Sequence, residues 1–342
     1  MRATIDAHRR IVEQGALVLR TSQKLPPEVK ARLVLGIDTP ANLQQLADRV
    51  SSKSRLASAI GSVRNRYVSM RKIVDSNFLQ SEQLRGYLSA SPDNFAVLTD
   101  YAAMEAYKDN TLISIYRSMA ILAEYPRQVI VLHGTQHACS LAGDGRAYWR
   151  RMIDDDQTQG FANYCLLLDR AQRGDAYVQH ELLELGREAT AQMERMLGDA
   201  QRMSAALDGI AATYTPEELR QLRRINTPYT DALVGKTVRH VMAMAAMLIA
   251  EHPTAPSFPN ANEAPDRFLF RIALCMFLLG LRWIAVGGAA NVSAQRLRND
   301  LVDINFAAFA TYFEGLLTAD DKLMSIYLEA QIWLQRVFST RG

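Results

Sequence analysis

The sequence predicts an α/β fold in which a short parallel sheet carries extensive helical additions. Most of the 342 residues have helical periodicity, two short apolar runs at 95–100 and 128–132 flank a helical stretch, and a third run lies at 316–318. A strand, a helix and a second strand at this spacing are typical of a parallel βαβ unit. We therefore expect one sheet whose strands come from distant parts of the chain.

The composition favours a folded, cytoplasmic protein. Hydrophobic residues make up 49% and charged residues 22%, which argues against disorder, and the net charge is only +3. Cys139, Cys165 and Cys275 are too widely spaced for a disulfide framework or a zinc motif, so a reducing compartment is expected. The first residues lack the apolar run of a signal peptide. The apolar stretch 268–286 contains two arginines, which indicates a buried helix rather than a membrane span.

Residues 1–92 are expected to form an N-terminal helical region. A helix is predicted over 26–35, with prolines at its start and Gly36 just past its end. Between 49 and 72 basic residues occur without a single acid, which suits the phosphate backbone of a nucleic acid, although a solvated helix face has the same pattern. The candidate nucleic-acid-binding residues are Arg49, Lys53, Arg55, Arg64, Arg66, Arg71 and Lys72.

The rest of the chain divides into three expected parts. Residues 93–146 form the first part of an α/β core, 147–265 a helical insertion, and 266–342 the second part of the core. A Pro- and Asn-rich loop near the end of the insertion marks the second boundary. Beyond the second strand, the helices predicted by periodicity cover 181–197, 237–250, 268–286, 291–313 and 321–337.

Acidic residues stand out in the second part of the core. Asp303 precedes a stripe of small residues, Ala307, Ala308 and Ala310, which lets a helix lie close against a sheet. This arrangement directs Asp303 toward the edge of the sheet. Asp320 emerges just beyond the strand at 316–318.

A second pair of acids belongs to the first part of the core. Asp100 ends the predicted strand 95–100, and Glu105 lies five residues further on, in the helix that follows. Ligands of open parallel sheets bind at the carboxyl ends of strands, so these acids are expected to meet Asp303 and Asp320 there. Four carboxylates at one edge repel one another unless a cation binds between them. Mg²⁺ or Mn²⁺ fits, because both prefer carboxylate oxygens and retain waters.

Each acid also has a structural interpretation. Asp100 and Asp320 are at positions suited to capping the following helices, and Asp321 would be a first-turn acid. Asp300 and Asp303, three residues apart on a helix, would lie on a solvated face paired with Arg296. Asp300, Thr318 and Asp321 are therefore secondary site candidates, Thr318 as a hydrogen-bond donor to an acid or to a substrate phosphate.

The segments beginning Asp303-Ile-Asn-Phe-Ala-Ala-Phe-Ala and Leu316-Leu-Thr-Ala-Asp320 resemble the C-terminal signature of PIN-domain nucleases. Val97-Leu98-Thr99-Asp100 and Met104-Glu105 resemble the strand and acid motifs of the same family. The resemblance implies a three-layer, PIN-like α/β domain with an acidic, metal-binding pocket. It also implies an enzyme that cuts RNA or, in some branches of the family, DNA flaps. Residues 1–92 and about 147–265 have no counterpart in the minimal fold.

The chain departs from the family pattern at the first acid. In most PIN domains the first-strand Asp precedes the helix Glu by tens of residues and is often followed by a small polar residue and Asn. We prefer Asp100 as the first-strand acid, with Asp38 as the alternative. If no first acid is present, the fold would be PIN-like but catalysis would be in doubt.

These observations predict a metal-dependent endoribonuclease in which Asp100, Glu105, Asp303 and Asp320 hold Mg²⁺ or Mn²⁺. RNA is favoured over DNA as the substrate, and the family resemblance suggests a homodimer with no membrane partner. The alternative is a non-enzymatic helical interaction protein with a degenerate PIN-like core. A third reading is a DNA-binding regulator that uses residues 39–72.

Overall fold

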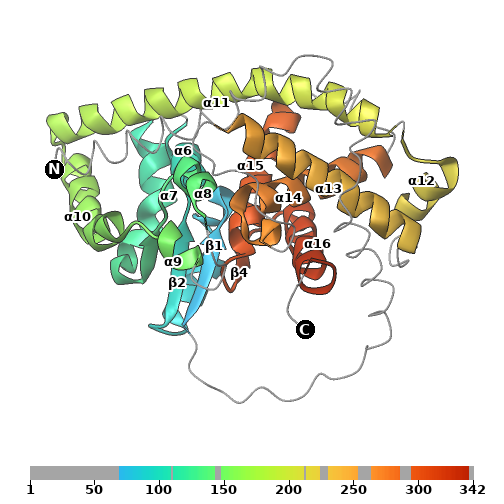
Figure 1. Ribbon diagram of the computed structural model, residues 1–342. Coiled ribbons are helices and arrows are strands. Elements are labelled where there is room, and N and C mark those ends of the chain that lie inside the picture. Colours follow the sequence, from blue (N-terminus) through green and yellow to red (C-terminus); the bar gives the residue numbers. More distant parts are fainter. Residues whose placement is uncertain are drawn as a thin grey trace.

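The computed structural model describes residues 69–108, 111–142, 148–211, 213–223, 230–252, 263–285 and 294–338. The described chain is mostly helical and contains a four-stranded parallel sheet (Figure 1). Its strands are adjacent in the order β3-β2-β1-β4. Their bounds are Met70–Val74 for β1, Asn94–Leu98 for β2, Val129–Val131 for β3 and Gly315–Leu317 for β4. The α/β class with a short parallel sheet is thus confirmed.

Strand β1 corrects the predicted division of the chain. It lies within the region 1–92 that was expected to be helical, yet it occupies the centre of the sheet. Ile73 is in register with Val97 of β2 and with Leu316 of β4, and it is fully buried. A core that begins at residue 93 would lack the strand that joins β2 to β4. The core therefore begins no later than β1.

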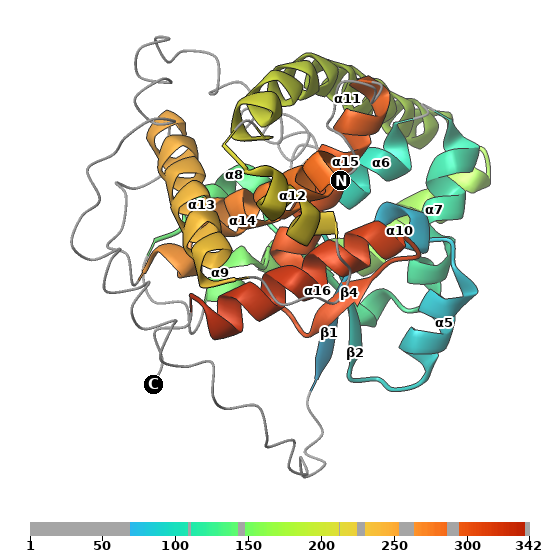
Figure 2. The same cartoon turned by 90° about the vertical axis from the view of Figure 1, so that its right-hand side faces the viewer.

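Helices connect the strands on the two faces of the sheet. The segment from β1 to β2 contains η2 (Ser76–Phe78) and α5 (Glu82–Ser89), and α5 begins where the Ser81 side chain accepts a hydrogen bond from the Gln83 amide. The segment from β2 to β3 contains α6 (Asp100–Tyr107), α7 (Leu112–Glu124) and η3 (Pro126–Gln128), and α8 (Thr135–Ser140) follows β3. Figure 2 shows the strands between α5 and α7 on one side and the C-terminal helices on the other.

In the described parts of residues 148–251, five helices follow. They are α9 (Tyr148–Met152), α10 (Asp155–Gln172), α11 (Ala176–Ala211), α12 (Pro216–Arg223) and α13 (Asp231–Glu251). The long helix α11 packs against α6 and runs across the end of the molecule toward which the strands point (Figure 1). In the described ranges, α13 alone has the length and apolar composition of a membrane span. It packs along α14 and buries Val241 and Ala245, so its apolar side has a protein partner.

The C-terminal part completes the sheet. It comprises η5 (Ala264–Asp266), α14 (Phe268–Ala285), α15 (Ala294–Ala310), β4 and α16 (Asp321–Arg336). Helix α15 packs on β1 and β4, and its alanines Ala307, Ala308 and Ala310 are fully buried. The small side chains thus allow the close helix–sheet packing that the sequence predicted. Helices α14 and α16 in turn pack on α15.

Candidate acidic site

The carboxyl ends of β1 and β4 lie side by side because the two strands are neighbours in the sheet. Asp75 follows β1 directly, and its amide donates to the carbonyl of Leu317 at 2.9 Å. The Asp75 side chain is buried, with the whole residue 1% exposed, and Thr318 Oγ1 donates to its Oδ2 at 2.7 Å. Asp75 and Thr318 thus join the two strand ends through a side-chain hydrogen bond.

Ser76 links this pair to helix α6. Its hydroxyl donates to Glu105 Oε2 and lies 3.4 Å from Asp75 Oδ1. Burial raises the pKa of Asp75, the hydrogen bond from Thr318 opposes this, and the nearby charge of Glu105 raises the pKa further. Lys108 Nζ lies 3.4 Å from Glu105 Oε1, on the same helix. The carboxylates of Asp75 and Glu105, which belong to different strand–helix units, therefore lie close to each other.

Asp303 of α15 and Asp320 complete the cluster. Burial and then the charge of Asp75 raise the pKa of Asp303 to about 8, with smaller contributions from Asp320 and Glu105, while Lys322 opposes them. Asp320 caps α16, because its Oδ1 accepts a hydrogen bond from the Leu323 amide at 3.0 Å. The Asp320 amide donates to Thr318 Oγ1 at 3.0 Å. We call Asp75, Glu105, Asp303 and Asp320 the acidic site.

Asp100, the preferred first-strand acid, is bonded away from the acidic site. It follows β2, and its side chain bonds toward the β3 side of the sheet. Its Oδ2 accepts from the Thr135 amide at 2.7 Å and its Oδ1 from the Thr135 hydroxyl at 2.8 Å. Asp100 is 1% exposed, and burial raises its pKa to about 6. These contacts make Asp100 a structural link between α6 and α8.

The residue that the sequence analysis missed is Asp75. The sequence did contain its signal: Asp75-Ser76-Asn77 follows the apolar pair Ile73-Val74 and precedes Glu105 by tens of residues. The bases Arg71 and Lys72 that precede this pair are more typical of a charged helix face than of a strand, so the local pattern does not indicate β1.

The secondary candidates have distinct positions. Thr318 donates to an acid of the site, whereas Asp321 is an exposed first-turn acid of α16. Asp300 is buried rather than solvated, with 3% of the residue exposed, and it forms an ion pair with Lys322. Asp38, the alternative first acid, lies outside the described residues.

The predicted basic surface is only partly described. Arg49, Lys53, Arg55, Arg64 and Arg66 lie outside the described residues. Arg71 donates from its amide and its Nε to Glu314 Oε2, each at 2.9 Å, and its guanidinium lies 3.6 Å from the centre of the Trp149 ring. Lys72 lies along Gly315, with its Nζ 5.0 Å from the centre of the Tyr87 ring. Both side chains thus have partners within the protein, and their assignment to a nucleic-acid surface stays a prediction.

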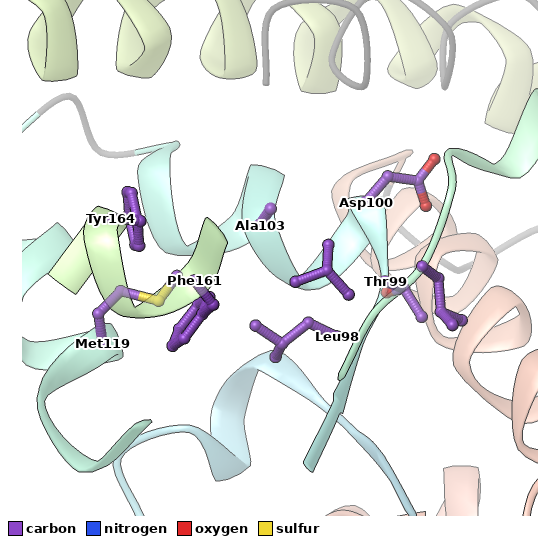
Figure 3. Close-up of a pocket in the computed structure, with 9 residues that line it drawn as sticks. Leu98, Thr99, Asp100, Ala103, Met119, Phe161 and Tyr164 are labelled. Atoms are coloured by element: carbon purple, nitrogen blue, oxygen red, sulfur yellow. The ribbon is translucent and has the colours of Figure 1, made fainter. Parts of the chain in front are cut away.

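A small cavity lies between the start of α6, α7 and α10 (Figure 3). Its volume is about 20 Å³, enough for one water molecule, and its lining is mainly apolar. Leu98, Met119, Phe161 and Tyr164 contribute to that lining, with Asp100 at one end. A cavity of this size cannot hold a nucleotide or a metabolite, so it adds no small-molecule site.

The acidic site has the chemistry of a site for a hard divalent cation. All four side chains of the site are carboxylates, and burial, followed by the charges of the other three acids, raises the pKa of Asp303. In the part of the chain that the structure describes, no three His, Cys, Asp or Glu side chains are grouped closely enough to hold an ion as they stand. The protein's own groups instead contact both carboxylate oxygens of Asp75 and of Glu105, and the Leu323 amide bonds to Oδ1 of Asp320.

Comparisons of the chain with protein-family models, with curated proteins and with solved structures found no match. The functional interpretation therefore depends on the chemistry of the acidic site and on the motif resemblance.

Proposed function

We propose that this protein is a PIN-like, metal-dependent nuclease that hydrolyses phosphodiester bonds, with RNA as the favoured substrate. The observation that carries the proposal is the burial of Asp303 among three other carboxylates at the ends of β1 and β4. Burying like charges together costs free energy, and such strongly perturbed acids are concentrated at functional sites. With Asp75 as the first-strand acid, the chain also fits the PIN pattern better than it does with Asp100.

Asp75, Glu105, Asp303 and Asp320 would hold Mg²⁺ or Mn²⁺ at this site. The bound ion would supply an activated water and stabilise charge on the leaving oxygen of the phosphodiester. The chain's own contribution is to orient the carboxylates. Thr318 holds Asp75, Ser76 holds Glu105, and the first turn of α16 holds Asp320, so hydrogen bonds orient three of the four acids.

Cleavage assays with the purified full chain test the proposal. Labelled single-stranded RNA and single-stranded DNA are incubated with Mn²⁺ or Mg²⁺, and Asp75→Asn and Asp303→Asn are compared with the parent. We expect Mn²⁺- or Mg²⁺-dependent cleavage, reduced in each variant by more than the roughly 10–100-fold that loss of an outer-shell partner causes. Asp169→Asn, an exposed acid paired with Arg173 on α10, serves as the matched control.

The competing candidate is a helical scaffold with a degenerate PIN-like core. It is favoured by the lack of any ready-made group of metal ligands among the described side chains. A scaffold predicts no cleavage of either nucleic acid with either metal, and no rise in melting temperature on adding Mn²⁺. These two negative results together would refute the nuclease proposal. The DNA-binding reading involves residues 39–72, of which the structure describes only the last four.

A further inference from the structure

Lys322 places a positive charge inside the acidic site. It lies in the first turn of α16, its ammonium forms an ion pair with Asp300 Oδ1, and it is 4.0 Å from Asp303 Oδ2. The side chains are 29% exposed for Lys322, 17% for Asp303 and 4% for Asp300. All three charged side chains are therefore partly or almost completely buried.

The backbone fixes this arrangement. Asp300 and Asp303 are three residues apart on α15, so they project from the same face of that helix. Helix α16 packs against α15, and the Asp320 cap defines the turn that carries Lys322. Asp300 Oδ2 is buried and has no hydrogen-bond partner among the described groups. The charge of Asp300 is consequently compensated through Lys322.

A second lysine provides a contrast. Lys108 pairs with Glu105 across one turn at the end of α6. Lys322 instead lies 4.0 Å from Asp303 Oδ2, where it opposes the rise in the pKa of Asp303 that burial and the charge of Asp75 cause. The face of Asp303 toward Asp300 is thus already neutralised by the protein itself.

We propose that Lys322 is a resident counter-cation that occupies the Asp300 side of Asp303, so that the acidic site binds one divalent ion rather than two. The count of ions rests on the proposed nuclease function, whereas the counter-cation role acts in the metal-free protein. A fixed ammonium beside Asp303 Oδ2 repels a dication that approaches the same oxygen. Removing that ammonium leaves Asp300 and Asp303 as an unoccupied pair of carboxylates.

The first experiment counts bound Mn²⁺ by titration calorimetry and by electron paramagnetic resonance of the free ion. We expect one Mn²⁺ per chain for the parent and for Lys322→Arg, which keeps the charge, and two for Lys322→Met. Lys236→Met removes another partly buried lysine, which pairs with Glu218 on a different helix, and should leave the count at one. Two ions on the parent, or one on Lys322→Met, would overturn the proposal.

The second experiment needs no metal and separates this proposal from the nuclease proposal. In chelator, Lys322→Met should melt at least roughly 3 °C below the parent, because Asp300 is left buried and unpaired. Adding Asp300→Asn should restore much of that loss, whereas it should not rescue Lys236→Met. If Asp300→Asn fails to rescue Lys322→Met, the counter-cation role is wrong. If the rescue occurs but the parent binds no Mn²⁺, the nuclease proposal and the ion count fail while the counter-cation role stands.

Discussion

At the scale of single residues, Asp303 has the most informative environment in the acidic site. Its carboxyl has a pKa of about 8, far above the ordinary 3.8, because burial and the charge of Asp75 disfavour its ionised form. Between these two pH values the folded protein holds a proton that the unfolded chain has released. Folding is therefore linked to pH through a residue that a metal ion would instead keep ionised.

This linkage predicts how stability changes with pH. In chelator, the free energy of unfolding should fall as pH rises from about 4 to about 8, by at most about 1.4 kcal/mol per pH unit for this one proton. Asp303→Asn should flatten the curve by that amount, measured by urea unfolding at pH 5, 6, 7 and 8. Asp75 and Asp100, whose pKa values are also raised by burial, add to the fall in stability, whereas His137, His240 and His252, whose pKa values burial lowers, oppose it, so the difference between parent and variant is the quantity to compare. Parallel curves for the parent and the variant would contradict the raised pKa of Asp303.

Asp75→Asn and Asp100→Asn should differ in their effects on cleavage and on stability. Asp75→Asn should abolish metal-dependent cleavage, since Asp75 lies within the acidic site. Asp100→Asn should retain cleavage per folded molecule but lower the free energy of unfolding by about 1–3 kcal/mol, because it disturbs the buried bonds to Thr135. Urea unfolding and cleavage rates of the two variants provide the comparison. Loss of cleavage in folded Asp100→Asn would restore Asp100 as the first acid.

At the scale of elements, the predictable strands were those with uninterrupted apolar runs. Strands β2, β3 and β4 and the helices α14 to α16 were all expected from such runs and from their terminal residues. Strand β1 was not, because only Ile73 and Val74 are apolar in its inner half, and Arg71 and Lys72 precede them. The partners that allow those bases into the sheet, such as Glu314, are hundreds of residues away. No local pattern can reveal such a partner.

The acids of the candidate site could likewise be predicted only where the element that carries them was recognised. Glu105, Asp303 and Asp320 belong to elements that were recognised, and the structure brings them close enough for their charges to interact. Asp75 follows the one strand that was not recognised. Asp100 was preferred because it ends a predicted strand, but the strand order, which the sequence does not specify, directs it toward Thr135 instead.

The ion pair of Arg71 should contribute to the stability of the sheet. Arg71→Ala removes the ion pair with Glu314, which connects β1 to the start of β4, and the contact with Trp149. We expect the free energy of unfolding to fall by about 2–4 kcal/mol, with nucleic-acid affinity unchanged. Urea unfolding and a filter-binding assay measure the two effects. Arg85→Ala, which breaks a surface pair with Glu82 and Glu124, should change stability little. A folded Arg71→Ala protein with weakened nucleic-acid binding would reinstate Arg71 as a surface contact.

At the scale of the whole molecule, helix α11 connects the two halves of the acidic site. It packs against α6, which carries Glu105, and against α15, which carries Asp303. Thr190 of α11 also donates to the carbonyl of Lys108, just past the end of α6. Through α11, the helical part over residues 148–251 is therefore coupled to the acidic site.

This coupling predicts that a core change in α11 alters metal binding at a distance. Leu185 is 5% exposed, so Leu185→Ala should lower the free energy of unfolding by about 2–4 kcal/mol. With Mn²⁺ at 100 times its dissociation constant the parent should gain about 2.7 kcal/mol, and the variant less, because α6 and α15 are held together less firmly. Arg187→Ala, on the exposed side of α11, should keep the full gain. Unfolding of the parent should be one cooperative transition. A separate transition for the helical part, with an unchanged response to Mn²⁺ in Leu185→Ala, would show that α11 is independent of the site.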